Sequence, residues 1–327
     1  LLYCLFYFIF FHLFKKISFN KIFVFAILSP MAFYFPILNS KATGQKEIIF
    51  LCLLSIFCFV LPKIKKNYAN YLMIIMTIIA GLSHEGLIFY IPYLVIPFII
   101  FFKFENFKDL SLNLFPVSVI TITLVVLIYI FSGSEQHTID ICNSIKLYSH
   151  PGCETIGHIS HLRFSIEGNI EQKISVVEDI LKISNTRYFS IYITGFIFGF
   201  LPLFILYGKS KLLILPAGQK FHPIFILFIP LLTTFPIYYL ASDWGRYLYI
   251  SYMSSLIIII FCLNNNIFEI NQSNVIRKDN LIIKIIFIIS IIIYGFGWSV
   301  PICCEKNFKS GILGAAKRVI YYYNKNN

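Results

Sequence analysis

Long apolar runs recur along nearly the whole chain, and short polar connections between them carry most of the charge. Ten runs can be drawn, and the longer ones match the roughly 20 residues that a helix needs to cross a bilayer. They cover residues 1–14, 21–38, 47–62, 70–83, 86–102, 112–132, 187–207, 221–240, 247–263 and 281–301. This pattern predicts an all-α, polytopic transmembrane helix bundle of about ten spans.

Composition excludes a soluble globular protein. Hydrophobic residues make up 58% of the 327 residues and charged residues only 13%, whereas soluble domains carry about 25% charged residues. We therefore expect one integral membrane domain over residues 1–327, with the lipid bilayer as its main partner. The chain begins without Met and its first run is short, so we interpret the start as a truncated helix.

Basic residues are distributed unevenly between alternate connections. One set of connections holds thirteen of them: Lys15, Lys16, Lys21, Lys63, Lys65, Lys66, Lys103, Lys108, Lys209, Lys211, Lys220, Arg277 and Lys278. The short connections of the other set hold three: Lys41, Lys46 and Arg246. The positive-inside rule places the first set in the cytoplasm. The net charge of +12 therefore reflects membrane topology, and we expect no nucleic-acid partner.

The same alternation places three segments together on the extracytoplasmic face: residues 83–86, the long loop 133–186 and residues 243–246. The loop holds Ile170, Ile174, Val177 and Leu181 at helical spacing with charges between them. This spacing predicts an amphipathic helix over 167–183, lying on the membrane surface.

The stretch from residue 70 to residue 102 is too long for a single span. Only Ser83, His84, Glu85 and Gly86 interrupt it. It predicts either two helices joined by a very tight turn or one helix followed by a re-entrant segment, which is tolerated at membrane depth only where it is buried in protein or lines a cavity.

Cysteines and histidines in the outer loop offer two alternatives. Cys142 and Cys153 flank the turn at Pro151, and an oxidising compartment favours a disulfide between them. His150, Cys153, His158 and His161 have spacings that could hold zinc, but Cys142 competes for Cys153. We favour the disulfide and expect no metal and no cofactor.

The sequence Asp243-Trp244-Gly245-Arg246-Tyr247 places an acid, a base and two aromatic rings between two apolar runs. A charged side chain costs about 2.5–3.5 kcal/mol at the centre of a membrane helix, so such residues are candidate functional groups. Arg246 suits a phosphate or diphosphate, because its planar fork donates two parallel hydrogen bonds. Asp243 could orient it or bind sugar hydroxyls, while Trp244 and Tyr247 could offer flat faces to a sugar or lipid head group. The alternative is an ordinary interfacial turn.

His84 and Glu85 form a second candidate pair, with Ser83 beside them as a substrate contact. Either ionisable group could act as a general base near neutral pH. The alternative is a polar turn in which Glu85 simply occupies the first turn of the next helix, where the helix dipole favours a negative charge.

The segment from Ala80 to Leu87, the following Pro92 and the segment from Asp243 to Tyr247 together resemble the bacterial polysaccharide polymerases of the Wzy and EpsG type. The resemblance implies an inner-membrane enzyme with its site on the extracytoplasmic face. Such an enzyme joins oligosaccharide units carried on undecaprenyl diphosphate, within a polysaccharide assembly complex and without a nucleotide sugar. It implies that His84 and Glu85 lie near the acceptor hydroxyl, and Arg246 near the donor diphosphate.

Two further arginines, Arg163 and Arg187, are candidate substrate-binding residues of the outer region. In the better-known polymerases an outer-loop Arg is followed sixteen residues later by Gly. Here Arg163 is followed at that distance by Asp179, and Arg187 by Leu203.

Other functions remain open at this point. A membrane glycosyltransferase that uses a polyprenyl-phosphate sugar has a similar layout. A flippase or transporter of lipid-linked sugars would place its charges at the bilayer midplane and often shows inverted repeats, whereas these charges cluster at one interface. A membrane acyltransferase could also use a lone His as its base.

Overall fold

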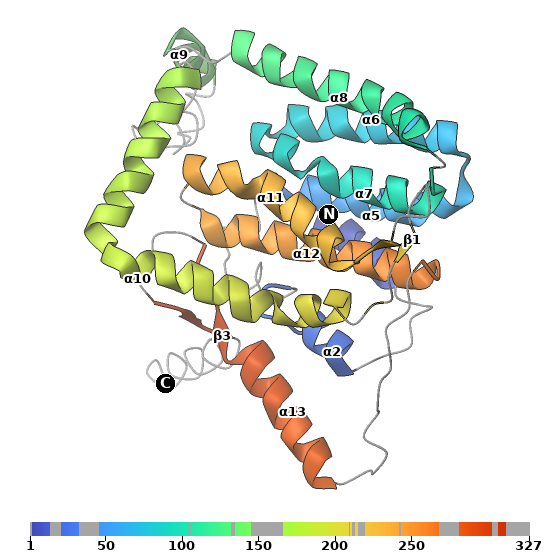
Figure 1. The fold of residues 1–327 in the computed structure, drawn as a ribbon. Helices are drawn as coiled ribbons and strands as arrows, with labels where there is room; N and C mark the ends of the chain where they lie inside the picture. Colours follow the sequence, from blue (N-terminus) through green and yellow to red (C-terminus); the bar gives the residue numbers. More distant parts are fainter. Residues whose placement is uncertain are drawn as a thin grey trace.

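The computed structural model describes residues 2–13, 21–32, 46–104, 106–131, 135–144, 166–208, 210, 213–214, 220–241, 243–267, 281–302 and 307–311. Nearly all of these residues lie in helices (Figure 1). The all-α prediction is therefore confirmed for the described part of the chain.

The first half of the chain forms a succession of helices. These are α1 (Leu2–Leu13), α2 (Lys21–Ile27), α5 (Ile48–Val60), the 3-10 helix η2 (Leu61–Lys63), α6 (Lys66–Ser83), the 3-10 helix η3 (Glu85–Tyr90), α7 (Pro92–Phe102), α8 (Phe107–Ile130) and α9 (Glu135–Ser144).

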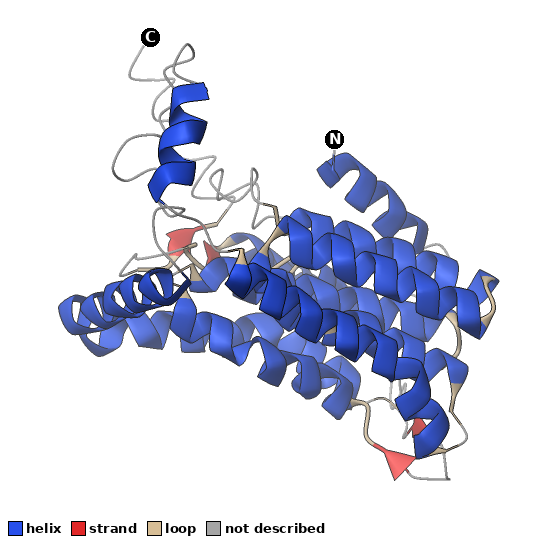
Figure 2. Cartoon of the chain, turned by 90° about the horizontal axis from the view of Figure 1, so that it is seen from above, coloured by secondary structure: helices blue, strands red, loops and turns tan. Residues whose placement is uncertain are grey.

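The second half adds α10 (Ile166–Gly208), α11 (Ile224–Leu240), α12 (Trp244–Asn264) and α13 (Leu281–Phe296). Two antiparallel pairs of two-residue strands lie at the edge of the helices (Figure 2). The first pairs β1 (Leu213–Ile214) with β2 (Lys220–Phe221), and the second pairs β3 (Trp298–Ser299) with β4 (Lys309–Ser310).

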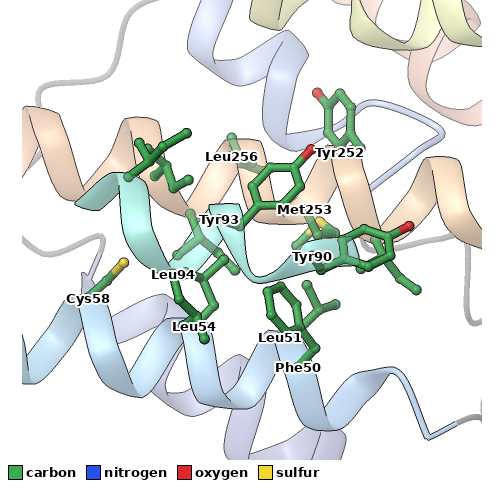
Figure 3. Close-up of a cluster of buried hydrophobic side chains, with 14 of the residues drawn as sticks. Phe50, Leu51, Leu54, Cys58, Tyr90, Tyr93, Leu94, Tyr252, Met253 and Leu256 are labelled. Atoms are coloured by element: carbon green, nitrogen blue, oxygen red, sulfur yellow. The ribbon is translucent and has the colours of Figure 1, made fainter. Parts of the chain in front are cut away.

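Helix α12 is the centre of the bundle, and α1, α5, α7, α10 and α11 all pack against it. Nearly every residue from Trp244 to Cys262 is buried, as expected for a helix with other helices on all sides. Figure 3 shows where α5, the η3–α7 segment and α12 meet, through Phe50, Leu51, Leu54, Cys58, Tyr90, Tyr93, Leu94, Tyr252, Met253 and Leu256.

Helix α8 lies at the periphery and exposes large apolar side chains. Phe115 is 67% exposed, and Leu112, Ile122, Tyr129 and Ile130 are similarly open. A soluble monomer rarely exposes a contiguous apolar surface of this extent, whereas a bilayer accommodates it. The structure thus supports a membrane protein.

Among the residues that the structure describes, four helical segments are long and apolar enough to cross a membrane. They are Glu85–Phe102, Phe107–Ile130, Phe189–Gly208 and Trp244–Asn264. The apolar helices Leu2–Leu13, Ile48–Lys63, Ile224–Leu240 and Ile285–Phe296 are shorter than a full span. The described residues therefore support a polytopic bundle but do not show the ten spans that the apolar runs predict.

The stretch 70–102 forms two segments joined by a very tight turn. Helix α6 ends at Ser83, His84 is extended, and η3 begins at Glu85. Pro92 then starts α7. Its lack of an N–H is tolerated there, because the N–H groups of a first helical turn have no acceptor within the helix. The structure agrees with the predicted tight turn between two helical segments.

The ends of these helices divide into two groups. Figure 1 shows the connection between α11 and α12 at the same end of the bundle as the junction of α6 and η3, towards α10. The connections α5–α6 and α7–α8, which carry Lys63, Lys65, Lys66 and Lys103, lie at the opposite end. The two candidate turns thus share one end of the bundle, as the alternation of basic residues predicts.

The expected amphipathic helix 167–183 is not a separate element. It is the first part of α10, which continues without interruption to Gly208. Its 43 residues span roughly 65 Å, about twice the apolar thickness of a bilayer. Figure 1 shows a bend, with the first part of α10 crossing the bundle end and the second part running beside α12.

Candidate functional site

His84 has a defined orientation because it ends one helix and caps the next. Its backbone is extended, with φ −164° and ψ 127°, and its Nδ1 accepts the N–H of Gly86 at 3.0 Å. This bond satisfies a donor at the start of η3 that has no partner within the helix. With Nδ1 accepting, the proton of the neutral ring lies on Nε2.

Arg246 lies in the first turn of α12, and this turn is anchored by a distant segment. The N–H of Gly245 donates to the carbonyl of Ile302 at 3.0 Å, and the N–H of Arg246 donates to that of Asp243 at 3.0 Å. A Cβ on Gly245 would overlap the carbonyl oxygen of Pro301. Only glycine therefore allows the approach that fixes the start of α12.

The two turns meet at one carboxylate, that of Glu47, which directly precedes α5. Nη1 of Arg246 lies 3.1 Å from Oε1 of Glu47, and Nε2 of His84 lies 3.8 Å from the same oxygen. The first contact is an ion pair at hydrogen-bond distance, and the second is too long for a hydrogen bond. His84 and Arg246 are thus neighbours on either side of Glu47.

Exposure increases outward through this group. The side chain of Glu47 is 3% exposed and that of Arg246 is 12% exposed, whereas Glu85 is 58% exposed. His84 and Asp243 lie between these extremes. A buried carboxylate without a partner would be very costly, so Arg246 is the compensating charge for Glu47. The ionised group therefore extends from the interior of the bundle to its surface.

Arg246 has additional partners on its own turn. Its Nη2 lies 3.1 Å from Oδ2 of Asp243 and donates to the hydroxyl of Tyr247 at 3.0 Å. The sequence-based expectation that Asp243 orients the guanidinium agrees with this geometry.

Trp244 and Tyr247 do not offer open faces to a ligand. They are only 7% and 4% exposed. The ring of Trp244 packs against Phe189, Tyr192 and Tyr238. Both side chains are buried because α12 is surrounded by other helices, so they support the site and do not offer flat faces to a sugar or lipid head group.

The other candidate residues have mixed outcomes. The hydroxyl of Ser83 donates to the carbonyl of Ile79 within its own helix at 2.6 Å. Arg163 lies outside the described residues, and Arg187 lies in α10 at a position where only the backbone is described. The disulfide between Cys142 and Cys153 also stays a prediction, because Cys153 lies outside the described residues.

The part of the chain that the structure describes holds no candidate metal site. No group of three or more His, Cys, Asp or Glu side chains comes together there in a way that could hold an ion. The loop residues considered for zinc, His150, Cys153, His158 and His161, lie outside that part.

Glu47 is the residue that sequence reasoning missed. It opens the apolar run 47–62 and follows the short connection that holds Lys41 and Lys46. The alternation of basic connections assigns this connection to the same face as His84 and Arg246. A single acid at the start of an apolar run on that face was the available signal.

The group combines a fixed guanidinium with partly exposed carboxylates. Such an arrangement can bind an anion through Arg246 and accept a proton at a neighbouring carboxylate. Comparison of the chain with protein-family models, curated proteins and solved structures found no match. The resemblance to polysaccharide polymerases therefore remains a prediction from the motifs.

Proposed function

We propose that this protein is a membrane enzyme that polymerises lipid-linked oligosaccharides by glycosyl transfer from a polyprenyl-diphosphate carrier. The observation that carries the proposal is the meeting of His84 and Arg246 at one oxygen of Glu47. Glycosyl transfer requires a cation at the departing diphosphate and a base at the acceptor hydroxyl, both near one anomeric carbon. The two turns supply these groups side by side.

Arg246 is the residue proposed to hold the diphosphate. Its fork donates two parallel hydrogen bonds and remains charged at any physiological pH. The buried carboxylate of Glu47 keeps the guanidinium at one position, so that little rearrangement is needed as negative charge develops on the leaving group.

Glu85 is the better candidate for the base than His84. The Nδ1 of His84 already accepts the N–H of Gly86, and its Nε2 carries the proton of the neutral ring and faces Glu47. Glu85 is exposed, and its Oε2 lies 3.7 Å from the His84 ring. Its carboxylate is therefore accessible to a hydroxyl group, whereas Nδ1 of His84 already accepts a hydrogen bond and Nε2 already carries a proton.

In the proposed step, the acceptor hydroxyl oxygen attacks the anomeric carbon of the donor sugar. Its proton passes to the carboxylate of Glu85 as the new glycosidic bond forms. The bond from the anomeric carbon to the diphosphate oxygen breaks, and the diphosphate leaves with the electron pair. Arg246 stabilises this growing negative charge. The reaction would take place on the extracytoplasmic face of a bacterial inner membrane.

Transport of a lipid-linked sugar is the second candidate, and the burial of Glu47 favours it. Ionisable groups inside membrane bundles often mark transport or proton pathways. Glu47 and Arg246 are both largely buried. An enzyme that uses a polyprenyl monophosphate carrier fits the same groups, because a single phosphate also accepts the fork of Arg246.

Reconstitution tests these alternatives. The purified full chain in liposomes is given a fluorescent polyprenyl-diphosphate oligosaccharide, and the product length is followed on gels. Longer products from wild type, and their loss in Arg246→Lys, support the proposal, since lysine keeps the charge but lacks the fork. Movement of unchanged substrate between leaflets would instead identify a transporter. Lys66→Arg, in the distant pair with Asp109, is the matched control.

A further inference from the structure

Both terminal nitrogens of the Arg246 guanidinium already have partners. Nη1 contacts Glu47, and Nη2 contacts both Asp243 and the hydroxyl of Tyr247. A phosphate that binds through two parallel hydrogen bonds needs one edge of the fork for itself. An anion can therefore bind here in the bidentate manner only if one existing partner leaves.

The two carboxylates differ in how easily they can leave. Glu47 is 3% exposed and lies between His84 and Arg246, so its departure would separate a buried carboxylate from the guanidinium that compensates its charge. Asp243 is 30% exposed and precedes α12, where its side chain caps no backbone N–H. Asp243 can therefore turn towards the surface without leaving a helix end unsatisfied.

The charges around Arg246 favour replacement of an existing carboxylate by the anion over addition of the anion as a third negative group. Glu47, Asp243 and Arg246 together carry one net negative charge when all are ionised, and Glu85 lies nearby. A further anion would place three negative groups around one guanidinium in a poorly solvated position, where repulsion is weakly screened. If the anion replaces Asp243, the number of negative groups at Arg246 stays the same.

We propose that the Nη2 edge of Arg246 is a phosphate-binding site that Asp243 occupies in the unliganded protein and vacates when the ligand binds. Glu47 remains in place as the fixed counter-ion. The identity of the ligand as a phosphate rests on the proposed function, but the exchange can be measured by binding alone. Either a free phosphate or the phosphate of a lipid head group has the required chemistry.

The test uses the purified full chain in nanodiscs of uncharged phosphatidylcholine, titrated with inorganic pyrophosphate by calorimetry. Asp243→Asn removes the competing charge and keeps the size of the side chain. We expect it to bind pyrophosphate on the order of tenfold more tightly than wild type. Arg246→Gln should lose this binding. Asp109→Asn, which neutralises a half-exposed aspartate in the separate pair with Lys66, should bind as wild type does.

A second titration distinguishes the source of the phosphate. Polyprenyl phosphate is incorporated into the nanodiscs, and binding is followed through native mass spectrometry. If Asp243→Asn binds only polyprenyl phosphate more tightly than wild type does, the site takes a lipid head group. If it binds pyrophosphate more tightly, the site takes a phosphate that arrives from water. Asp243→Ser provides the same comparison if the asparagine variant is poorly folded.

Equal or weaker binding by both Asp243 variants, in both arms, overturns the exchange. This outcome is separate from failure of the proposed function. If wild type transfers sugar but the Asp243 variants bind phosphate with unchanged affinity, the proposed enzyme activity stands and the proposed exchange at Arg246 is wrong. If the Asp243 variants bind phosphate more tightly but wild type transfers no sugar, the proposed exchange stands and the proposed enzyme activity is wrong.

Discussion

Nη1 of Arg246 lies 3.1 Å from Oε1 of Glu47, so the first turn of α12 is paired with the residue that opens α5. The two residues lie 199 positions apart in the chain, and both are largely buried. Their contact brings the turn at His84 to the turn at Asp243, since His84 faces the same oxygen. The candidate site therefore depends on the packing of three helix ends.

Replacement of Glu47 by Gln should lower stability more than replacement of a surface acid. Breaking a buried ion pair costs about 3–5 kcal/mol, and the remaining contacts of Arg246 with Asp243 and Tyr247 would reduce this loss. The thermal unfolding midpoint in detergent measures the effect. Asp109→Asn breaks a half-exposed pair and should cost only about 0–1 kcal/mol. Equal losses in the two variants would show that Glu47 is not a buried structural partner of Arg246.

Replacement of Gly245 by Ala should destabilise the start of α12. The added methyl group would overlap the carbonyl of Pro301, and overpacking of this kind costs about 1–3 kcal/mol. Gly208→Ala is the control, because no atom lies within 4 Å of a Cβ built there. The unfolding midpoint should fall for Gly245→Ala and stay level or rise slightly for Gly208→Ala. An unchanged midpoint for Gly245→Ala would contradict the close approach of residues 301–302.

Glu85 and His84 should have different effects on chain elongation. Glu85→Gln should abolish product formation while leaving the unfolding midpoint unchanged, because its exposed side chain contributes little to packing. His84→Ala should retain part of the activity but lose about 1 kcal/mol of stability, because Nδ1 caps η3. Gel analysis of products and thermal unfolding measure the two effects. Full activity in Glu85→Gln with none in His84→Ala would reassign the base to His84.

The topology predicts where reporter proteins fused to the chain will be active. A fusion after Ser134 should be extracytoplasmic, and one after Lys65 should be cytoplasmic. The reason is that the set of alternate connections that includes Lys65 holds thirteen basic residues, whereas the short connections of the other set hold three. Paired alkaline phosphatase and green fluorescent protein fusions measure this. A cytoplasmic signal after Ser134 would place the candidate site on the other side of the membrane.

The sequence by itself determined the helical membrane character, the two polar turns and their common end of the bundle. Each of these follows from a local property: the length of an apolar run, a charge between two runs, or the alternation of basic connections. The tight turn at His84 followed in the same way, because the apolar stretch around it was too long for one helix.

Only the tertiary structure decided which side chains meet. It paired Glu47 with Arg246, buried Trp244 and Tyr247, and joined the predicted surface helix to the rest of α10. In a membrane bundle the lipid-facing and core-facing sides of a helix are equally apolar, so hydrophobic periodicity does not reveal which faces pack together. The partners of Glu47 are therefore set by helix packing, which no local pattern in the sequence records.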